Sequence, residues 1–304
     1  MALYRQVTEQ IADQVEAGLL VPGTHLPSIR EAARLYDTTT ATVGRAYREL
    51  ADAGVIDVRD RARSRVAAEG PAAARRLLSG QVTLRLAGSD DPALDLAVSA
   101  AGASVISVGE KGSVQGLTRL WHGTADAAAI HLPHRSGIAN KPFATTVLRD
   151  RQPVIVHLWR REQGFLTPRG NPDRIAGPAD LGPLRIARRR FGTGTRVLLD
   201  QLLTQAGISP DQVSGPEASS HLEVAISVAT GQADTGLGVR AAASALDLDF
   251  VPVAWEEFDV VLSGAMLPAA EPFIAALRDA AVLAAAAALG GYDTSRTGVV
   301  EALA

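Results

Sequence analysis

The 304-residue sequence contains no cysteine, which excludes disulfides, thiolate metal sites and a cysteine nucleophile. Lysine is almost absent: of 30 basic residues, only Lys111 and Lys141 are lysine. Aromatic residues make up only 4% of the chain. The net charge of −3 gives no basic field over the whole molecule, so any contact with nucleic acid must come from a local patch.

No apolar run is long enough to predict a membrane span. The alanine-rich run over residues 280–291 is short and follows the charged stretch EPFIAALRD. The first twenty residues are polar and periodic, without the apolar core of a signal peptide. We therefore expect a cytoplasmic protein with no membrane partner. With 47% hydrophobic residues, the chain has enough apolar material for two domains.

The first 68 residues show a helix-helix-helix-hairpin pattern. Residues 3–18 place apolar side chains four apart, on one helical face. Ser28 and Glu31 form a capping box that begins a second helix, and a third helix is predicted from about residue 40 to 53. Two short strands around an arginine-bearing turn follow over residues 55–68. This order is typical of an α+β winged helix-turn-helix domain, and we expect a linker over 69–81.

Residues 3–56 resemble the DNA-binding domain of GntR-type transcription regulators. The matching residues are Pro22-Gly23, Leu26-Pro27-Ser28, Arg30-Glu31, Thr42-Val43, Arg45-Ala46-Tyr47, Glu49-Leu50 and Gly54. In that family the third helix enters the major groove, and the arginine after the Pro-Ser helix start lies near the phosphates. The resemblance therefore implies DNA contacts from Arg30, Thr40, Thr42 and Arg45, with Arg48 further along.

The predicted hairpin carries a local positive charge. Arg59, Arg61, Arg63 and Arg65 face one acidic residue, Asp60, which gives a charge near +3. A patch of this kind suits the DNA backbone, and we assign Arg61 and Arg63 to it. The alternative is that these arginines are solvated side chains on a helical module that only packs. The family's usual wing-tip glycines are missing here, and a glycine stands at position 44 of the recognition helix.

From residue 82 to about residue 290, predicted strands alternate with helices. This alternation indicates an α/β domain with parallel strands, divided into two sheets. A long extended run is expected over 145–165, a returning pair of strands over 248–262 and one long closing helix over 271–289. Residues 291–304 are expected to form a flexible tail.

The stretch from about Leu84 to Leu283 resembles the two-lobed periplasmic-binding-protein-like domain, type II, found fused to bacterial regulators and to some molybdopterin-biosynthesis proteins. The matching residues are Gly88-Ser89-Asp90, Ser113 with Gly116-Leu117, Gly123 with Asp126, His131-Leu132, Arg161-Glu162-Gln163-Gly164, Gly192-Thr193-Gly194-Thr195-Arg196, Leu199-Asp200, His221, Gly231 with Asp234, and Gly236-Leu237-Gly238. The resemblance implies two lobes that close on a ligand across paired crossover strands near 153–160 and 249–262.

Glycine and hydroxyl residues at predicted helix starts are typical of an anion site. The free N–H groups and the dipole of a helix start attract negative charge, and a guanidinium at Arg196 suits carboxylate or phosphate. We expect ligand contacts from Gly88, Ser89, Ser113, His131, Thr193, Gly194, Thr195, Arg196, His221 and Asp234. Two alternatives stay open: a plain capped turn with Thr195 as N-cap, and an ion pair between Arg196 and Asp200.

These features predict a ligand-responsive bacterial transcription regulator. It would bind operator DNA as a homodimer and sense a small anion, either an oxyanion such as molybdate or tungstate or a carboxylate or phosphate metabolite. We predict no enzyme activity, no cofactor and no metal, since no two histidines have a metal-ligand spacing. One alternative is a GntR-type fusion with a pyridoxal-phosphate enzyme, which needs a Schiff-base lysine, Lys111 or Lys141. Another is a transport binding protein, which needs an export signal.

Overall fold

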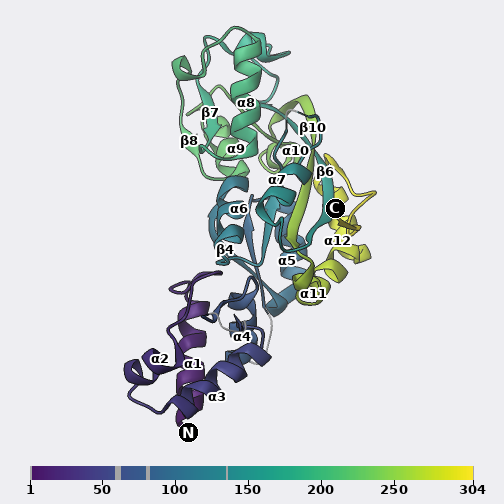
Figure 1. The fold of residues 1–304 in the computed structure, drawn as a ribbon. Helices are drawn as coiled ribbons and strands as arrows, with labels where there is room; N and C mark the ends of the chain where they lie inside the picture. Colours follow the sequence, from purple (N-terminus) through teal and green to yellow (C-terminus); the bar gives the residue numbers. More distant parts are fainter. Residues whose placement is uncertain (1, 59–62, 80–82, 135, 304) are drawn as a thin grey trace.

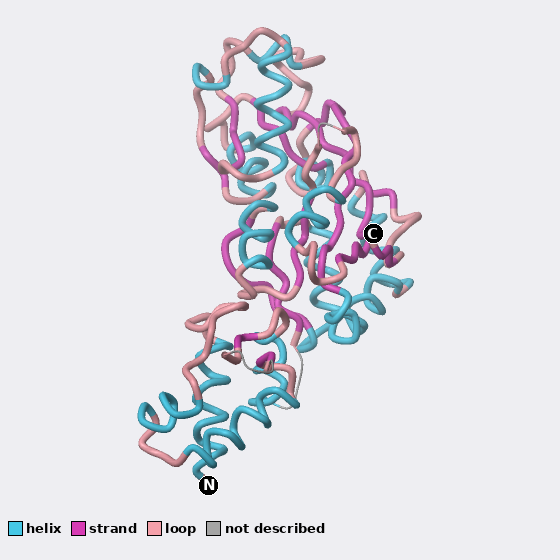
Figure 2. Tube along the Cα trace, in the orientation of Figure 1, coloured by secondary structure: helices cyan, strands magenta, loops and turns pink. Residues whose placement is uncertain are grey.

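The computed structural model describes residues 2–58, 63–79, 83–134 and 136–303. A helical N-terminal unit and two α/β lobes follow one another along an elongated molecule (Figure 1). In Figure 2 the strands run through both lobes, with helices on either side.

The N-terminal unit has the predicted order of elements. It consists of α1 (Leu3–Glu16), α2 (Ile29–Leu35), α3 (Thr40–Asp52), β1 (Ile56–Asp57), β2 (Arg65–Val66) and α4 (Gly70–Ser79). The capping box is confirmed: the Ser28 hydroxyl accepts from the Glu31 N–H, and the Glu31 carboxylate accepts from the Ser28 N–H. The side chains predicted to face inward from α3 are all buried: Val43, Ala46, Tyr47 and Leu50. β1 and β2 pair antiparallel, as expected of a wing.

Residues 70–79 are not the linker that the sequence predicted. They form α4, and Ala73 and Ala74 on this helix belong to the same core as Ile11 of α1. Small side chains allow two helices to approach closely, so an alanine-rich stretch that looks like a connector packs here as a helix. The N-terminal unit therefore extends to about residue 79.

The two lobes share one ten-stranded sheet, with the strand order β4-β3-β5-β10-β6-β9-β7-β8 and with β11 and β12 added to β6. The expectation of two separate sheets was wrong. The elements are β3 (Leu84–Gly88), α5 (Pro92–Ala101), β4 (Val105–Lys111), α6 (Ser113–Trp121), β5 (Ala127–Ile130), α7 (Lys141–Val147), β6 (Pro153–Thr167), β7 (Ile186–Arg189), α8 (Gly194–Gln205), β8 (Glu217–Ala218), α9 (His221–Ala229), β9 (Thr235–Val239), α10 (Arg240–Ser244), β10 (Asp249–Ser263), α11 (Leu267–Arg278), α12 (Ala280–Leu289), β11 (Tyr292–Asp293) and β12 (Val300–Ala302).

The long strands β6 and β10 join the lobes. They pair antiparallel over almost their whole length, with β5 beside β10 in the first lobe and β9 beside β6 in the second. This confirms the two predicted crossover strands, although residues 248–262 form one continuous strand rather than a pair. The predicted extended run over 145–165 is also shorter, because α7 extends to Val147 and the strand begins at Pro153.

The predicted closing helix is divided in two at Asp279. The Asp279 side chain accepts hydrogen bonds from the N–H groups of Ala281 and Val282, so it caps α12 as a new helix. Aspartate favours this capping position over a helix interior. No single described helix is long and apolar enough to span a membrane; residues 264–278 and 280–289 meet that test only as a pair bent by 61°.

The end of the chain is ordered, in contrast to the flexible tail expected over 291–304. β11 and β12 both pair antiparallel with β6, and they cover the side of β6 opposite β10 in the first lobe. Glu301 adds side-chain contacts to Lys141 at 2.5 Å and to the buried His157 at 3.2 Å. Sequence periodicity missed these strands because they are short and pair with a distant partner.

We predict that a chain ending at Gly290 is less stable. The truncation removes the backbone pairing along β6 and the two contacts of Glu301. We expect a loss of about 2 kcal/mol, which lowers Tm by about 4–8 °C for a domain of this size. Thermal unfolding followed by circular dichroism measures the shift. An unchanged Tm would show that the C-terminal strands contribute nothing to stability.

Candidate functional site

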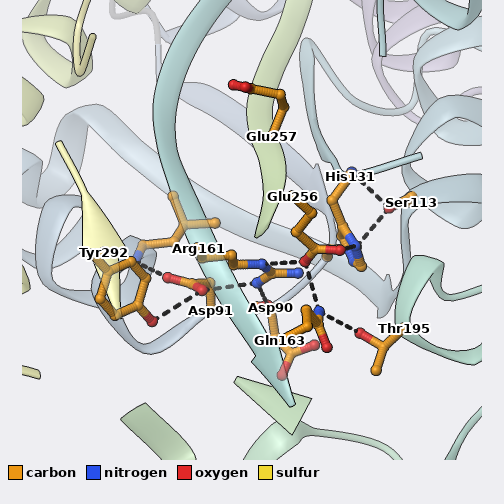
Figure 3. Close-up of polar contacts among 12 residues, drawn as sticks. Asp90, Asp91, Ser113, His131, Arg161, Gln163, Thr195, Glu256, Glu257 and Tyr292 are labelled. Atoms are coloured by element: carbon orange, nitrogen blue, oxygen red, sulfur yellow. Dashed lines mark hydrogen bonds and ion pairs between the residues drawn. The ribbon is translucent and has the colours of Figure 1, made fainter. Parts of the chain in front are cut away.

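A buried ion-pair cluster lies where β6 and β10 cross between the lobes (Figure 3). Its centre is Arg161 of β6, whose side chain is fully buried. Arg161 donates from Nε to Glu256 of β10 at 2.6 Å and from Nη1 to Asp91 at 2.8 Å. Asp91 is the N-cap of α5, so the cluster joins a helix of the first lobe to both crossover strands. A buried guanidinium requires this kind of pairing, because an isolated buried charge is strongly destabilising.

Glu256 extends the cluster into both lobes. Its Oε1 also accepts a hydrogen bond from Gln163 Nε2 at 2.6 Å, and its Oε2 lies 3.1 Å from Nδ1 of His131. The same Gln163 nitrogen lies 3.0 Å from the hydroxyl of Thr195 in the second lobe. Burial alone would raise the pKa of Glu256, but His131 and Arg161 more than offset it and hold that pKa well below its usual range. Glu256 is therefore ionised at neutral pH.

Two predicted serines meet beside this cluster. The hydroxyls of Ser89 and Ser113 are 2.8 Å apart, and the Ser113 hydroxyl accepts a hydrogen bond from the backbone N–H of His131. Ser89 follows Gly88, whose Cα lies so close to β5 that an added Cβ would be 2.2 Å from the Ala129 oxygen. Position 88 therefore requires glycine, because the backbone there has a positive φ and lies against β5. This close approach brings Ser89 to the junction.

A cross-lobe ion pair forms on the other side of the junction. Asp90, in the first lobe, accepts a hydrogen bond from Arg189 Nη2 at 2.6 Å. Arg189 ends β7 in the second lobe and also donates to the carbonyl of Ser219. The second carboxylate oxygen of Asp90 accepts from the backbone N–H of His221, the first residue of α9. Burial opposes ionisation of Asp90, but Arg189 overcomes this and its pKa lies below the ordinary value.

Several buried polar atoms at the junction have no partner among the described residues. They are Arg161 Nη2, Gln163 Oε1, Arg189 Nε and both ring nitrogens of His221. A buried polar atom without a partner is costly, and native proteins keep few of them. These five atoms, from four residues, lie at the junction between the lobes.

The two cleft histidines are neutral at pH 7. Burial lowers the pKa of His131, an effect only partly offset by Glu256. Burial also lowers the pKa of His221 well below its ordinary value, and the charges of Arg189 and Arg161 push it further in the same direction. A neutral imidazole offers one donor and one acceptor, so His221 can bind a ligand without adding charge.

The side chains of two predicted ligand residues, Arg196 and Asp234, pair with other residues of the second lobe. Arg196 donates from Nε to both carboxylate oxygens of Asp200, at 2.8 and 3.0 Å, so the alternative of an ion pair holds for its side chain. Asp234 precedes β9 at the opposite end of the second lobe from His221, and it pairs with Arg185. Their motifs were recognised correctly, but their side chains stabilise the lobe rather than line the junction.

The loop over residues 192–195 lies at the junction, as predicted, with different roles for its members. Thr193, not Thr195, is the N-cap of α8, because its hydroxyl accepts from the Arg196 N–H. Gly194 packs directly on the first lobe: an added Cβ would be 2.2 Å from the His131 oxygen. The loop therefore contributes close backbone contact across the lobes together with the hydroxyl of Thr195.

A cavity of about 340 Å³ opens next to the cluster. It lies between the loop after β5, the start of α8 and the middle of β10, and His131 and Glu256 form part of its wall. Trp255 and Glu257 of β10 line it as well. Of the polar cluster, His131 and Glu256 reach this cavity, whereas Arg161, Arg189 and His221 are not among its lining residues.

The predicted DNA-contact side chains are mostly exposed on one end of the molecule. Arg30, Thr40, Arg45 and Arg48 are exposed, and Thr42 is half-buried beside the N-cap Thr39. The Arg45 guanidinium lies 3.8 Å from the centre of the Tyr4 ring in α1, which holds it against the surface of the unit. In the wing, Arg63 pairs with Glu31 at 3.2 Å. Arg61 lies outside the described residues.

The sequence motifs include Asp90, Arg161 and Gln163 but assign them no role. Arg189 belongs to a basic run, Arg185 with Arg188–Arg190, for which the sequence left three possibilities open: lining the cleft, facing solvent or meeting DNA. Glu256 was not predicted. The available signal was the charge pattern, since Arg161 lies in a strand that is otherwise largely apolar. Among the described ranges, no three side chains of His, Asp or Glu are placed to hold a metal ion.

The helical unit and the two lobes thus define a DNA-binding type of domain joined to a ligand-binding type of domain. The family model for bacterial regulatory proteins of the gntR family matches residues 3–66, and the model for the PBP superfamily domain matches residues 96–278. The chain therefore belongs to the PBP superfamily, and it carries a GntR-family domain at its N-terminus.

The relatives match one part of the chain each. The uncharacterised protein YvgK of Bacillus subtilis (strain 168) is 32% identical over 199 residues, which is 62% of this chain and 63% of that protein. The HTH-type transcriptional regulator Rv1152 of Mycobacterium tuberculosis (strain ATCC 25618 / H37Rv) is 44% identical over 59 residues, which is 19% of this chain and 49% of Rv1152. In both cases the chain spans less than two thirds of the relative's length.

The fold of the second domain is also found in a solved structure. The sulfate-binding protein SubI from Mycobacterium tuberculosis H37Rv superposes with a TM-score of 0.52 at 13% identity, over 69% of this chain and 86% of SubI. At this identity the likeness concerns the fold alone.

We predict that His221→Gln reduces the dependence of stability on pH. The folded protein keeps His221 neutral, whereas the unfolded chain binds a proton as pH falls below about 6.5, so His221 lowers stability as pH falls. Removing it should eliminate up to about 1 kcal/mol of the loss between pH 6.5 and 5.5. Urea unfolding of the wild type and the variant at the two pH values measures the difference. An equal loss in both proteins would contradict the assignment of a neutral His221.

Proposed function

We propose that the protein is a transcription regulator that binds operator DNA through its N-terminal unit and a small anionic effector between its lobes. The observation that carries this proposal is the set of buried, unpartnered polar atoms of Arg161, Arg189 and His221 at the lobe junction. Guanidinium and imidazole nitrogens that no described protein group satisfies are suited to the oxygens of an anion. Through the GntR-family domain, binding of the effector at this site would change the affinity of the protein for DNA.

The surface of the N-terminal unit supports DNA binding. Hydroxyl and guanidinium groups at the start of a recognition helix can reach base edges, while arginines at a wing contact phosphates. Thr40, Thr42 and Arg45 occupy the first turns of α3, and Arg63 lies beside the wing. A single unit of this size reads only a half-site, so we propose a homodimer on a two-fold symmetric operator. Such a regulator acts in the cytoplasm.

The junction between the lobes supports an anionic effector. Helices α6, α8 and α9 all begin there, at Ser113, Gly194 and His221, and a helix start favours negative charge. The hydroxyls of Ser89, Ser113 and Thr195 add donors, and buried guanidiniums provide charge. An oxyanion such as molybdate or tungstate, or a carboxylate or phosphate metabolite, has the matching chemistry.

The contact between the two domains supports communication between them. Arg75 of α4 forms an ion pair with Asp126 of the first lobe, and the same carboxylate accepts from the backbone N–H of Arg85 in β3. On the other side, Arg85 lies 3.9 Å from Glu16 at the end of α1. A movement of the first lobe on ligand binding therefore reaches both α1 and α4.

A pyridoxal-phosphate enzyme is the less supported alternative. Lys141 is paired with Glu301 near the C-terminal strand, and Lys111 is exposed at the end of β4. Neither lysine is part of the polar cluster at the junction.

We predict that Arg45→Ala weakens binding to an operator selected from random DNA more than binding to unselected DNA. A good contact between arginine and a base is worth about 1–3 kcal/mol, so the operator affinity should fall about tenfold or more. Arg63→Ala should weaken binding to both DNAs and flatten the salt dependence. Arg76→Ala, on the exposed side of α4, is the matched control and should leave both affinities unchanged. Fluorescence anisotropy at fixed salt measures all four proteins, and equal operator affinity in wild type and Arg45→Ala would refute α3 as the reading helix.

We predict that the effector raises Tm and changes operator affinity. A ligand at a hundredfold excess over its Kd adds about 2.7 kcal/mol of stability. A thermal-shift screen of oxyanions, organic acids and phosphorylated metabolites should identify the class. Ser113→Ala should then weaken binding of the active compound about tenfold, because it removes a buried donor at the junction. Ser99→Ala, on α5, serves as the matched serine control. A compound that binds tightly without altering operator affinity would contradict a sensory role, since coupling is reciprocal.

A further inference from the structure

We propose that Asp90 is an internal carboxylate that occupies the anion subsite of the second lobe, formed by Arg189 and the start of α9, and that the carboxylate or oxyanion of the effector replaces it. This inference rests on the proposed effector-binding function of the same junction. Arg189 and the start of α9 would bind the anion, and Asp90 would leave this subsite when the ligand enters.

The contacts of the Asp90 side chain all lead away from its own lobe. One oxygen accepts from Arg189 Nη2 at 2.6 Å, and the other accepts from the His221 N–H at 3.3 Å. A guanidinium and a helix N-terminal N–H are both well suited to bind a carboxylate or phosphate ligand. Asp90 therefore stands in the position, and makes the bonds, of a bound anion.

The neighbouring Asp91 shows what a structural carboxylate looks like in this cleft. One of its oxygens accepts from the N–H groups of Ala93 and Leu94 in its own lobe. The other accepts from Arg161 and from the hydroxyl of Tyr292. Asp91 is thus fixed from several directions, whereas the side-chain hydrogen bonds of Asp90 to Arg189 and His221 cross to the second lobe and would be broken when the lobes separate.

The subsite retains unused capacity while Asp90 is in it. Arg189 is 2% exposed, and its Nε has no partner among the described residues. His221 is 1% exposed, and neither of its ring nitrogens has a hydrogen-bond partner in the part of the chain that the structure describes. Asp90 accepts from Nη2 of Arg189 and from the backbone N–H of His221, but Arg189 Nε and the one ring N–H of the neutral His221 remain available to a ligand. A ligand with more acceptor oxygens than a single aspartate can satisfy them, which gives it an advantage over Asp90.

The charge balance favours replacement over simple addition. The junction already contains three carboxylates, on Asp90, Asp91 and Glu256, against two guanidiniums, on Arg161 and Arg189. With both histidines neutral, a further anion would enter a site of net negative charge, which is unfavourable at low dielectric. If Asp90 leaves the subsite for solvent, the incoming anion restores the same balance. Its exposure, with 14% of the side chain accessible, shows that solvent is near.

The test is chemical rescue of Asp90→Ala by small anions. The variant leaves Arg189 without its carboxylate, so its Tm should fall in chloride buffer. Acetate or sulfate, added at matched ionic strength, should raise the Tm of Asp90→Ala clearly more than that of the wild type. By calorimetry, the affinity of the variant for the rescuing anion should exceed that of the wild type about tenfold or more. Rescue by acetate alone indicates a planar carboxylate subsite, and rescue by sulfate alone indicates a tetrahedral one.

Two further variants keep the test decisive. Asp234→Ala is the matched control, because Asp234 also pairs with an arginine and accepts from a backbone N–H, but at the far end of the second lobe. Its Tm should fall without selective rescue. Adding Arg189→Gln to Asp90→Ala should abolish the rescue. If Asp90→Ala does not fold, Asp90→Asn, which keeps the shape and removes the charge, should show the same gain in anion affinity.

The proposal is overturned if anions stabilise the Asp90 variants no more than the wild type and Asp234→Ala. That result would leave operator binding and the effector screen untouched, because neither depends on which residue holds the anion. Conversely, rescue of Asp90→Ala without any operator binding would support the subsite while refuting the regulatory function.

Discussion

The buried guanidinium of Arg161 is the constraint on which the arrangement of the second domain depends. It lies at the crossing of the two long strands and can be accommodated only with compensating carboxylates. Asp91 brings the start of α5 to it, and Glu256 lies directly opposite Arg161 in the antiparallel pairing of β10 with β6. Because Glu256 also holds Gln163 and His131, a change at one member of this network alters the hydrogen bonds on both sides of the junction.

The two lobes share one arrangement at their outer ends, an aspartate that precedes a buried strand and pairs with an arginine. In the first lobe, Asp126 precedes β5 and accepts from the backbone N–H of Arg85; in the second, Asp234 precedes β9 and accepts from the backbone N–H of Arg185. Both carboxylates also pair with an arginine side chain. The repeated Gly-x-x-Asp motif, at Gly123 and Gly231, therefore marks the turn into a buried strand. This is why a motif that was correctly recognised at Asp234 indicated lobe architecture and not ligand contact.

Local features were predictable and long-range pairings were not. The capping box at Ser28 follows from side chains close together in sequence, and so does the presence of Ser113 and Thr195 at helix starts, whereas the two crossover strands were implied by the family resemblance. By contrast, Arg161 and Glu256 are 95 positions apart, and Asp90 and Arg189 are 99 apart. Nothing in the local sequence specifies which carboxylate meets which guanidinium. For the same reason the C-terminal strands were mistaken for a flexible tail.

The position of α4 determines how the effector domain can act on DNA. This helix is packed in the core of the N-terminal unit and is also tied to the first lobe through Arg75 and Asp126. A rigid helix shared in this way transmits rotation, whereas a flexible linker would absorb it. The first lobe and the DNA-binding unit should therefore move as one body, and closure should displace the second lobe relative to both. In a dimer, the spacing of the two α3 helices on DNA would then depend on contacts that the second lobe makes or loses when the effector replaces Asp90.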